Sequence, residues 1–208
     1  MLAPDGAGGV EFRAEAGGGG LALLPTKLYY TQGYYASGDP HNLTVTAPTT
    51  GSLVLIIQSD GRAATSVTQT NVTWTEMFTA NNGSLYTSFW VGAITDAAGT
   101  TISADYASST KAELTFIVFD GPELTTLEGS GVESSGHVSL SGVPLGTLCL
   151  AAETAFNANS NTYTINSAPH LIIVQGGCLM ITSYYYSGPT YTDFIQGATR
   201  HDAAVGLS

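Results

Sequence analysis

Short apolar runs of strand length recur from about His41 to the end of the chain, each bounded by Gly, Pro, Asn, Asp or Ser. LTVTA (43–47), SLVLIIQS (52–59) and AELTFIVF (112–119) are three of them. Segments with a helical period are almost absent, and the best helical candidate, DAAVGL near the end of the chain, is short and ambiguous. Many short strands at close spacing predict an all-β fold, an antiparallel β-sandwich, since an α/β fold would need long amphipathic segments between strands.

The first forty residues differ from the rest of the chain. They contain GAGG and GGGG and show no sustained apolar alternation. We therefore predict an extended, Gly-rich N-terminal arm over residues 1–40 and a β-sandwich domain over residues 41–208. VEFRAEA (10–16) and LALLPTKLYY (21–30) could each form a short strand, but only by packing against something else.

The two halves of the predicted domain show weak internal sequence similarity, which we call the sequence echo. GSLVLIIQS (51–59) resembles GTLCLAAET (146–154), and residues 83–108 loosely match residues 177–198. Each half alone would leave one apolar sheet face uncovered. The echo therefore predicts two pseudo-repeated halves that complete one jelly-roll-like sandwich.

The charge balance bears on the class of partner. Five Lys and Arg stand against sixteen Asp and Glu, a formal net charge of −11, and only 10% of residues are charged. Binding to nucleic acid or to an anionic membrane surface depends on cationic side chains, so we expect neither partner. We also expect no export signal, because the acidic, Gly-rich start lacks a basic region followed by a continuous apolar stretch.

Residues 51–121 contain an apolar strand, a segment that includes NVTWT, an aromatic strand, a Thr-containing segment and a second apolar strand that ends in FDG. The residues concerned are Ser66, Val67, Thr68, Asn71, Thr73, Trp74, Thr75, Phe89, Trp90, Thr100, Thr101 and FDG at 119–121. The pattern resembles a recurrent β-sandwich module of phage virion and tail proteins and of some secreted bacterial surface proteins. That family often has an acid where Gln69 stands here, so a polar role for that acid does not carry over. The resemblance implies a non-enzymatic virion or surface component.

Catalytic groups are not indicated by any motif. The histidines are His41, His137, His170 and His201, and no GxSxG nucleophile elbow is present. Ser135 lies close to His137, but in a strand-like run such residues usually form the solvated face. Asp105 and Glu113 have no special neighbours in the sequence, and we interpret them as ordinary surface acids. We therefore predict that the protein is not an enzyme.

Metal and cofactor sites are equally unsupported by the sequence. Cys149 and Cys178 lie in apolar runs without His or Cys at zinc-ligand spacing. Two buried, unlinked thiols are the first interpretation, and a cross-strand disulfide stays open. NANSNTY (157–163) has no acid to bind Ca²⁺, and GAGG and GGGG lack the Lys of a phosphate loop. We expect no metal and no cofactor.

Aromatic residues are the one enriched class for which we expect a partner role. Trp74 and Trp90 lie in strand-like segments and are predicted in the core. The tyrosines gather in two clusters, and the predicted partner-contact residues are Tyr29, Tyr30, Tyr34, Tyr35, Tyr184, Tyr186 and Tyr191. Adjacent tyrosines on a strand point to opposite faces, so one would pack on the domain while its neighbour faces water or another subunit. A turn at Gly33 would instead gather the first four into one platform.

Two functional classes follow. The first is a structural component of an assembled particle, a phage capsid decoration, tail or fibre protein. Such a protein would use its arm to contact copies of itself and other virion proteins, and it would reside in the virion after assembly in the host cytoplasm. The second is an extracellular or cell-surface module that binds carbohydrate through exposed tyrosines. An enzyme would need a convergent polar pocket, which the sequence does not indicate.

Overall fold

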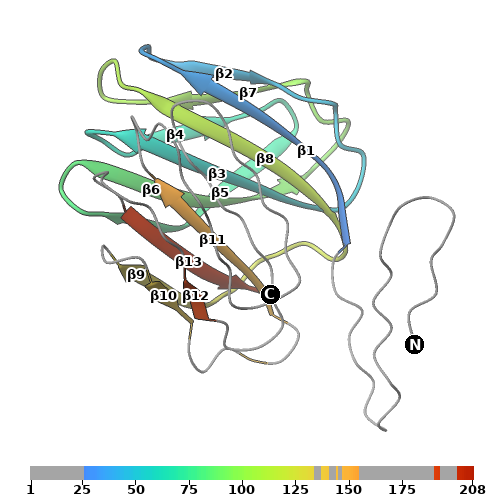
Figure 1. Ribbon diagram of the computed structural model, residues 1–208. Helices are drawn as coiled ribbons and strands as arrows, with labels where there is room; N and C mark the ends of the chain where they lie inside the picture. Colours follow the sequence, from blue (N-terminus) through green and yellow to red (C-terminus); the bar gives the residue numbers. More distant parts are fainter. Residues whose placement is uncertain (1–25, 134–136, 141–143, 145–146, 155–189, 193–200) are drawn as a thin grey trace, which may run out of the picture.

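The computed structural model describes residues 26–133, 137–140, 144, 147–154, 190–192 and 201–208, and within them all regular structure is β-strand (Figure 1). The strands are β1 Thr26–Tyr35, β2 His41–Thr44, β3 Ser52–Asp60, β4 Ser66–Thr68, β5 Val72–Asn81, β6 Leu85–Ile94, β7 Thr101–Asp105, β8 Ala112–Asp120, β9 Leu127–Glu133, β10 His137–Ser139, β11 Leu148–Thr154, β12 Thr190–Thr192 and β13 His201–Leu207. All their pairings are antiparallel, so the predicted all-β class is confirmed for these residues. The short helical candidate near the end of the chain is β13.

The strands form four sheets. The central sheet has five strands in the order β1-β8-β3-β6-β5. The first covering sheet has the order β2-β7-β4, the second covering sheet β11-β13-β9, and β10 pairs with β12 in a two-stranded sheet. The central sheet lies between the two covering sheets (Figure 1).

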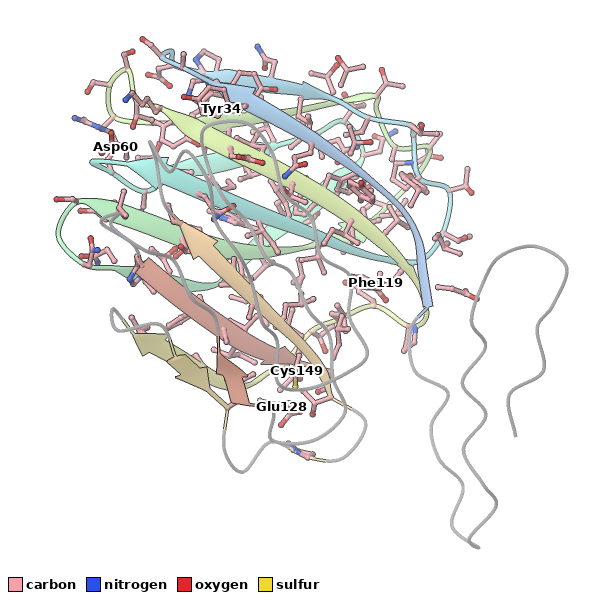
Figure 2. All side chains as sticks on the ribbon, in the orientation of Figure 1. Tyr34, Asp60, Phe119, Glu128 and Cys149 are labelled. Atoms are coloured by element: carbon pink, nitrogen blue, oxygen red, sulfur yellow. The ribbon has the colours of Figure 1, made fainter. Side chains whose placement is uncertain are left out.

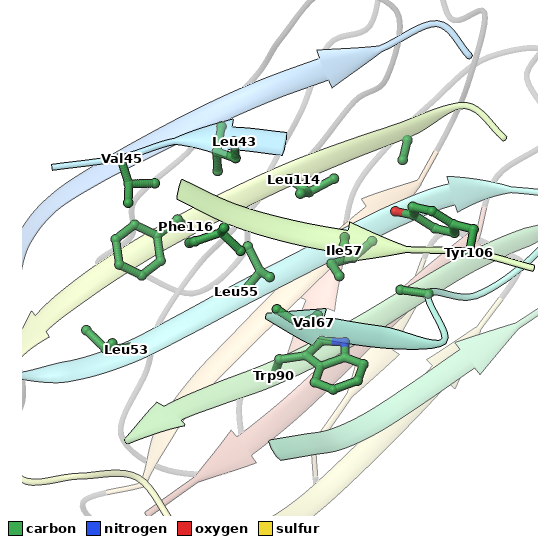
Figure 3. Close-up of a cluster of buried hydrophobic side chains, with 14 of the residues drawn as sticks. Leu43, Val45, Leu53, Leu55, Ile57, Val67, Trp90, Tyr106, Leu114 and Phe116 are labelled. Atoms are coloured by element: carbon green, nitrogen blue, oxygen red, sulfur yellow. The ribbon is translucent and has the colours of Figure 1, made fainter. Parts of the chain in front are cut away.

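Both faces of the central sheet are packed. On one face, Leu55 and Phe116 meet Leu43 and Ile102 of the first covering sheet, in a cluster that we call the first core (Figure 3). On the other face, the central sheet meets the second covering sheet in the second core. Because successive side chains alternate between faces, a strand buried on both faces needs a continuous apolar run. This explains why β3 and β8 are buried along almost their whole length.

The second core contains Phe89 and Phe119 from the central sheet, against Leu150 and Val205 from the second covering sheet. The outer face of this covering sheet carries a small third cluster, in which Cys149 packs with Leu140, Ala151 and Ala204. Cys149 is a free, fully buried thiol, and burial raises its pKa to about 11. Cys178 lies outside the described residues.

The central sheet begins within the segment that the sequence predicts as an arm. β1 pairs with β8 from Thr26 to Tyr35, so this part of residues 1–40 belongs to the sheet by its hydrogen bonds. Each of its two pairs of adjacent tyrosines can place one ring on either face of a strand, and the apolar strand β8 supplies the partner that such a short segment needs. The remainder of the predicted arm, residues 1–25, lies outside the described residues.

The same strand order occurs twice. In the central sheet β8 lies between β1 and β3, and in the second covering sheet β13 lies between β9 and β11. Likewise β2 pairs with β7, and β10 pairs with β12. The sequence echo matches β3 with β11, which hold corresponding places, but it aligns Leu53 of the first core with Leu148 of the second core. The two aligned leucines therefore face different cores.

Within the stretch that carries the family resemblance, Gln69 and Asn71 have structural roles at the turn between β4 and β5. Asn71, between β4 and β5, has a positive φ of 57°, and its Nδ2 donates to the carbonyl of Ala97 at 2.7 Å. The Nε2 atom of Gln69 donates to the carbonyl of Gly99 at 2.7 Å. Gln69 and Asn71 thus connect the β4–β5 turn to the β6–β7 loop. The amide of Gln69 donates a hydrogen bond to a carbonyl, which an ionised carboxylate at this position could not do.

Candidate functional site

The tyrosines of β1 divide between the two faces of the strand. Tyr29 and Tyr35 pack against the first core. Tyr30 and Tyr34 are 44% and 38% exposed. The predicted alternation is therefore confirmed, and each pair consists of one anchoring ring and one outward ring.

Hydrogen bonds and ring contacts fix the two inward rings. The hydroxyl of Tyr29 donates to the carbonyl of Thr46 at 3.0 Å, and its ring meets Phe116 edge-on at 6.1 Å. The hydroxyl of Tyr35 donates to the carbonyl of Asn42 at 2.6 Å. Burial raises the pKa of both phenols. Since both acceptors lie on or beside β2, the inward rings tie the edge strand to the first covering sheet.

Gly33 does not form a turn, which corrects the alternative of a four-tyrosine platform. β1 runs through Gly33, which pairs with Leu114 in unbroken register from Tyr29 to Tyr35. The pairing with β8 keeps the strand extended, and an extended strand cannot bring adjacent tyrosines to one face. Gly33 serves close packing instead, because an added Cβ would lie 2.9 Å from Leu43 Cδ1 and 2.9 Å from the hydroxyl oxygen of Tyr35.

We expect Gly33→Ala to lower the free energy of unfolding by about 1–3 kcal/mol, because the added methyl group overpacks a filled site. Urea denaturation measures the change. A Leu43→Ala background removes one of the two close contacts and leaves that with Tyr35, so the Gly33→Ala cost should shrink there without vanishing. Equal costs in both backgrounds would contradict the packing argument.

An exposed apolar strip lies on the outward side of β1. Five large hydrophobic residues are exposed in the described part of the chain, namely Leu28, Tyr30, Tyr34, Leu127 and Val132. The first three lie on this one strand, with Leu28 at 52% exposure, and Tyr34 is near its end (Figure 2). Clustered apolar exposure on one element is typical of an interaction surface, whereas single exposed residues are ordinary. This strip is the candidate functional site.

Glu113 is not an ordinary surface acid, contrary to the prediction from sequence. It is fully buried, and Gln32 Nε2 donates to its Oε1. The reason is its place on β8, which is interior to the central sheet and covered on both faces. A local reading sees only a Glu that begins an apolar run.

Further buried polar groups join the central sheet to the second covering sheet. Gln58 Nε2 donates to Thr154 Oγ1 at 2.9 Å, and the hydroxyl groups of Thr87 and Thr154 are 2.7 Å apart. All three residues are fully buried. Enclosed in this way, they connect strands and are out of reach of a dissolved substrate.

His41 is stacked beside the inward tyrosines. Its ring lies 4.6 Å from that of Tyr35 and 5.1 Å from that of Tyr106. Its Nε2–H donates to the carbonyl of Thr110 at 3.1 Å, since a carbonyl can only accept. Burial lowers the pKa of His41, against smaller raising effects of the Thr110 hydrogen bond and the charge of Asp39.

We expect the protein to lose stability as the pH falls below about 6.5, the ordinary pKa of histidine. His41 and His201 both have a pKa lowered by burial, so in this range the unfolded chain binds more protons than the folded chain. Urea denaturation at several pH values measures the slope. His41→Phe should reduce the slope between about pH 5 and about pH 7. An unchanged slope would contradict the assignment of the pH dependence to this ring.

The other predicted contact residues are described only in part. Tyr184 and Tyr186 lie outside the described residues. Tyr191 is on β12, opposite Val138 of β10, and only its backbone is described. Of the predicted chemical candidates, Ser135 and His170 also lie outside the described residues.

Asp105, the second acid considered for catalysis, has a structural contact. Ser66 Oγ donates to its Oδ2 at 2.7 Å across the β4–β7 pair. Trp90, predicted in the core, is confirmed there at 7% exposure, and Trp74 is half-buried against the first core. Within the described ranges, no group of three or more His, Cys, Asp or Glu could hold a metal ion. The same part of the chain includes no helix with the length and apolar character to cross a bilayer.

Sequence reasoning missed Leu28 as part of the strip and Gln32 as the partner of Glu113. Leu28 lies two residues before Tyr30, but it stands at the register shift between Lys27 and Tyr29, where simple alternation does not assign a face. The pairing of Gln32 with Glu113 had no local signal, because 81 residues separate them. Comparisons of the chain with family models, curated proteins and solved structures found no match.

Proposed function

We propose that the chain is a non-enzymatic structural subunit of an assembled particle, a phage virion component such as a capsid decoration, tail or fibre protein. One observation carries the proposal: Leu28, Tyr30 and Tyr34 form an exposed apolar strip on the edge strand of a sheet whose faces are otherwise packed. Tyrosine suits subunit contacts, because its ring is buried while its hydroxyl group still finds a hydrogen-bond partner. The partners are copies of the chain itself and other virion proteins.

The fold proposed for this subunit is a sandwich of two pseudo-repeated jelly rolls that follows an N-terminal arm. The orders β1-β8-β3-β6 and β2-β7-β4 support a first jelly roll, because late strands return beside early ones. The orders β9-β13-β11 and β10-β12 support a second, related half. The central sheet would then be shared, with its second face covered by the second half.

Composition also supports a particle component. With only 10% charged residues, the surface relies on uncharged polar groups. Uncharged polar groups can form hydrogen bonds across a subunit contact, although the net charge of −11 repels copies of the chain at long range. We place the protein in the virion, assembled in the host cytoplasm, with the cell surface as the alternative.

The proposal is tested by the molar mass of the purified full chain, measured by light scattering over a wide range of concentrations. We expect the mass to rise in steps from one chain to a defined oligomer. Replacing Leu28 and Tyr34 with Ser should move this transition to concentrations at least tenfold higher, which corresponds to about 1.4 kcal/mol. A matched Thr73→Ala and Thr75→Ala variant on the opposite edge strand should not. A monomer at every concentration would overturn the proposal.

A carbohydrate-binding module is the second candidate. Tyr30 and Tyr34 are exposed on the same face of β1, which is the arrangement that successive sugar rings would need. A glycan array probed with the full chain and with Tyr34→Ala separates the two functions. Binding that depends on Tyr34 would favour this candidate, and assembly without any glycan binding would exclude it.

A further inference from the structure

We propose that the outer edge of β1 binds residues 10–16 of a second copy of the chain, which add as a further strand to the central sheet. The inference rests on the proposed function, because it names the contact that joins the subunits. It depends on three features of the molecule: a long edge strand, an apolar strip on that strand, and a segment of matching pattern just before it.

The two edges of the central sheet differ. β5, at one edge, is interrupted by a bulge between Glu76 and Phe78, and two of its outward residues are the polar Thr73 and Thr75. β1, at the other edge, is ten residues long. Its register shift lies near its start, between Lys27 and Tyr29, and from Tyr29 to Tyr35 it pairs regularly with β8. No described strand lies beyond β1. A regular edge strand is a template for pairing with another chain, and a bulge or polar residues reduce that tendency.

The apolar strip determines which side chains an added strand would need. Leu28 and Tyr34 are 52% and 38% exposed, and Tyr30 is exposed between them. An added strand contributes backbone hydrogen bonds, while its side chains pack against those of the neighbouring strand on the same face. The edge of β1 therefore favours a strand with one apolar face.

VEFRAEA (10–16) has this pattern. Val10, Phe12 and Ala14 alternate with Glu11, Arg13 and Glu15, so an extended chain has one apolar face and one charged face. Such a strand buries its apolar face only against another strand. Placed beside β1, its apolar face would cover the strip while its charged face stays in water.

The connection to β1 favours a second copy over the same copy. Residues 17–25, including GGGG, separate the segment from β1. Most hairpin loops have about 2–5 residues, and consecutive glycines increase the entropy lost on closing a longer one. The same linker, fully extended, spans about 30 Å, which is enough to reach a neighbouring subunit.

A cross-linking experiment tests the contact directly. In a Cys178→Ser background that keeps the buried Cys149, Phe12→Cys and Tyr34→Cys are placed in separate chains, purified apart, mixed and oxidised. We expect a disulfide between the two chains, identified by mass spectrometry of the linked peptides. Glu11→Cys, on the charged face, is the matched control and should cross-link to Tyr34→Cys at least tenfold less.

The second measurement is the concentration required for assembly, compared between variants without added cysteines. Val10→Ser with Phe12→Ser should raise the concentration required for assembly at least tenfold, and Glu11→Ser with Glu15→Ser should leave it nearly unchanged. Assembly of the full chain with neither effect would overturn this inference and leave the proposed function standing. A disulfide within one chain, formed by a monomer carrying both Phe12→Cys and Tyr34→Cys, would also overturn it. A wild-type chain that never assembles would overturn both.

Discussion

Replacing Phe116 with Ala is expected to lower the free energy of unfolding by about 3–5 kcal/mol, the range for large aromatic residues in a core. Phe116 is fully buried in the first core. Its ring meets Tyr29 edge-on at 6.1 Å and Trp74 at 6.2 Å. Truncation removes both contacts and leaves a cavity between the central sheet and the first covering sheet. Urea denaturation monitored by tryptophan fluorescence measures the loss.

Phe116→Leu is the matched control. It keeps most of the volume, so its cost should stay below about 1.5 kcal/mol. Because Phe116 also supports Tyr29, the Ala variant should loosen β1 and weaken assembly, whereas the Leu variant should retain most of it. A loss of less than about 1 kcal/mol in the Ala variant would show that this face of the central sheet is not a packed core.

Replacing Phe89 with Ala is expected to have an effect of the same size, about 3–5 kcal/mol, on the opposite face of the same sheet. Phe89 is fully buried in the second core, near Leu150 and Val205 of the second covering sheet. In a two-layer sandwich one face of each sheet meets water, and truncation there would cost little. The variant therefore tests whether the second covering sheet is packed on the central sheet.

Val132→Ala is the control for that experiment. Val132 lies on β9 of the same covering sheet and is 48% exposed, so its truncation should change stability by no more than about 0.5 kcal/mol. Similar costs for Phe89→Ala and Val132→Ala would contradict the second core. A large cost for Phe89→Ala alone supports the three-layer arrangement.

Local pattern predicts the strands well in this chain. SLVLIIQS became β3, and AELTFIVF became most of β8, because a continuous apolar run of this length fits a strand buried on both faces. Tyr29 and Tyr30 separate to opposite faces for an equally local reason, the period of two along a strand. These features depend only on the geometry of the extended chain.

Features that depend on distant partners could not be predicted. β1 belongs to the central sheet because β8 lies beside it, and nothing near Thr26 in the sequence indicates that partner. Glu113 is buried because covering strands from other parts of the chain enclose β8. The turn imagined at Gly33 fails for the same reason, since pairing with β8 keeps the strand extended. In all three cases the outcome depends on strands that are distant in the sequence.

The candidate site was predicted in part. The first tyrosine cluster and its two-sided arrangement follow from the sequence, and the structure adds that Tyr30 and Tyr34 share their strip with Leu28 on an edge strand. A sequence cannot say which strand of a sheet is at the edge, because strand order is set by the whole topology. Tyr184 and Tyr186 stay predictions.

Hydrogen–deuterium exchange of β1 tests the central claim, assembly through its edge, most directly. Exchange is compared between dilute monomer and concentrated oligomer, with β3 as the internal reference because it is interior to the central sheet. In an antiparallel edge strand, alternate amides point away from the sheet and lack a strand partner. We predict that peptides covering 26–35 exchange markedly more slowly in the oligomer while β3 is unchanged. An oligomer in which β1 exchanges as fast as in the monomer would contradict the account.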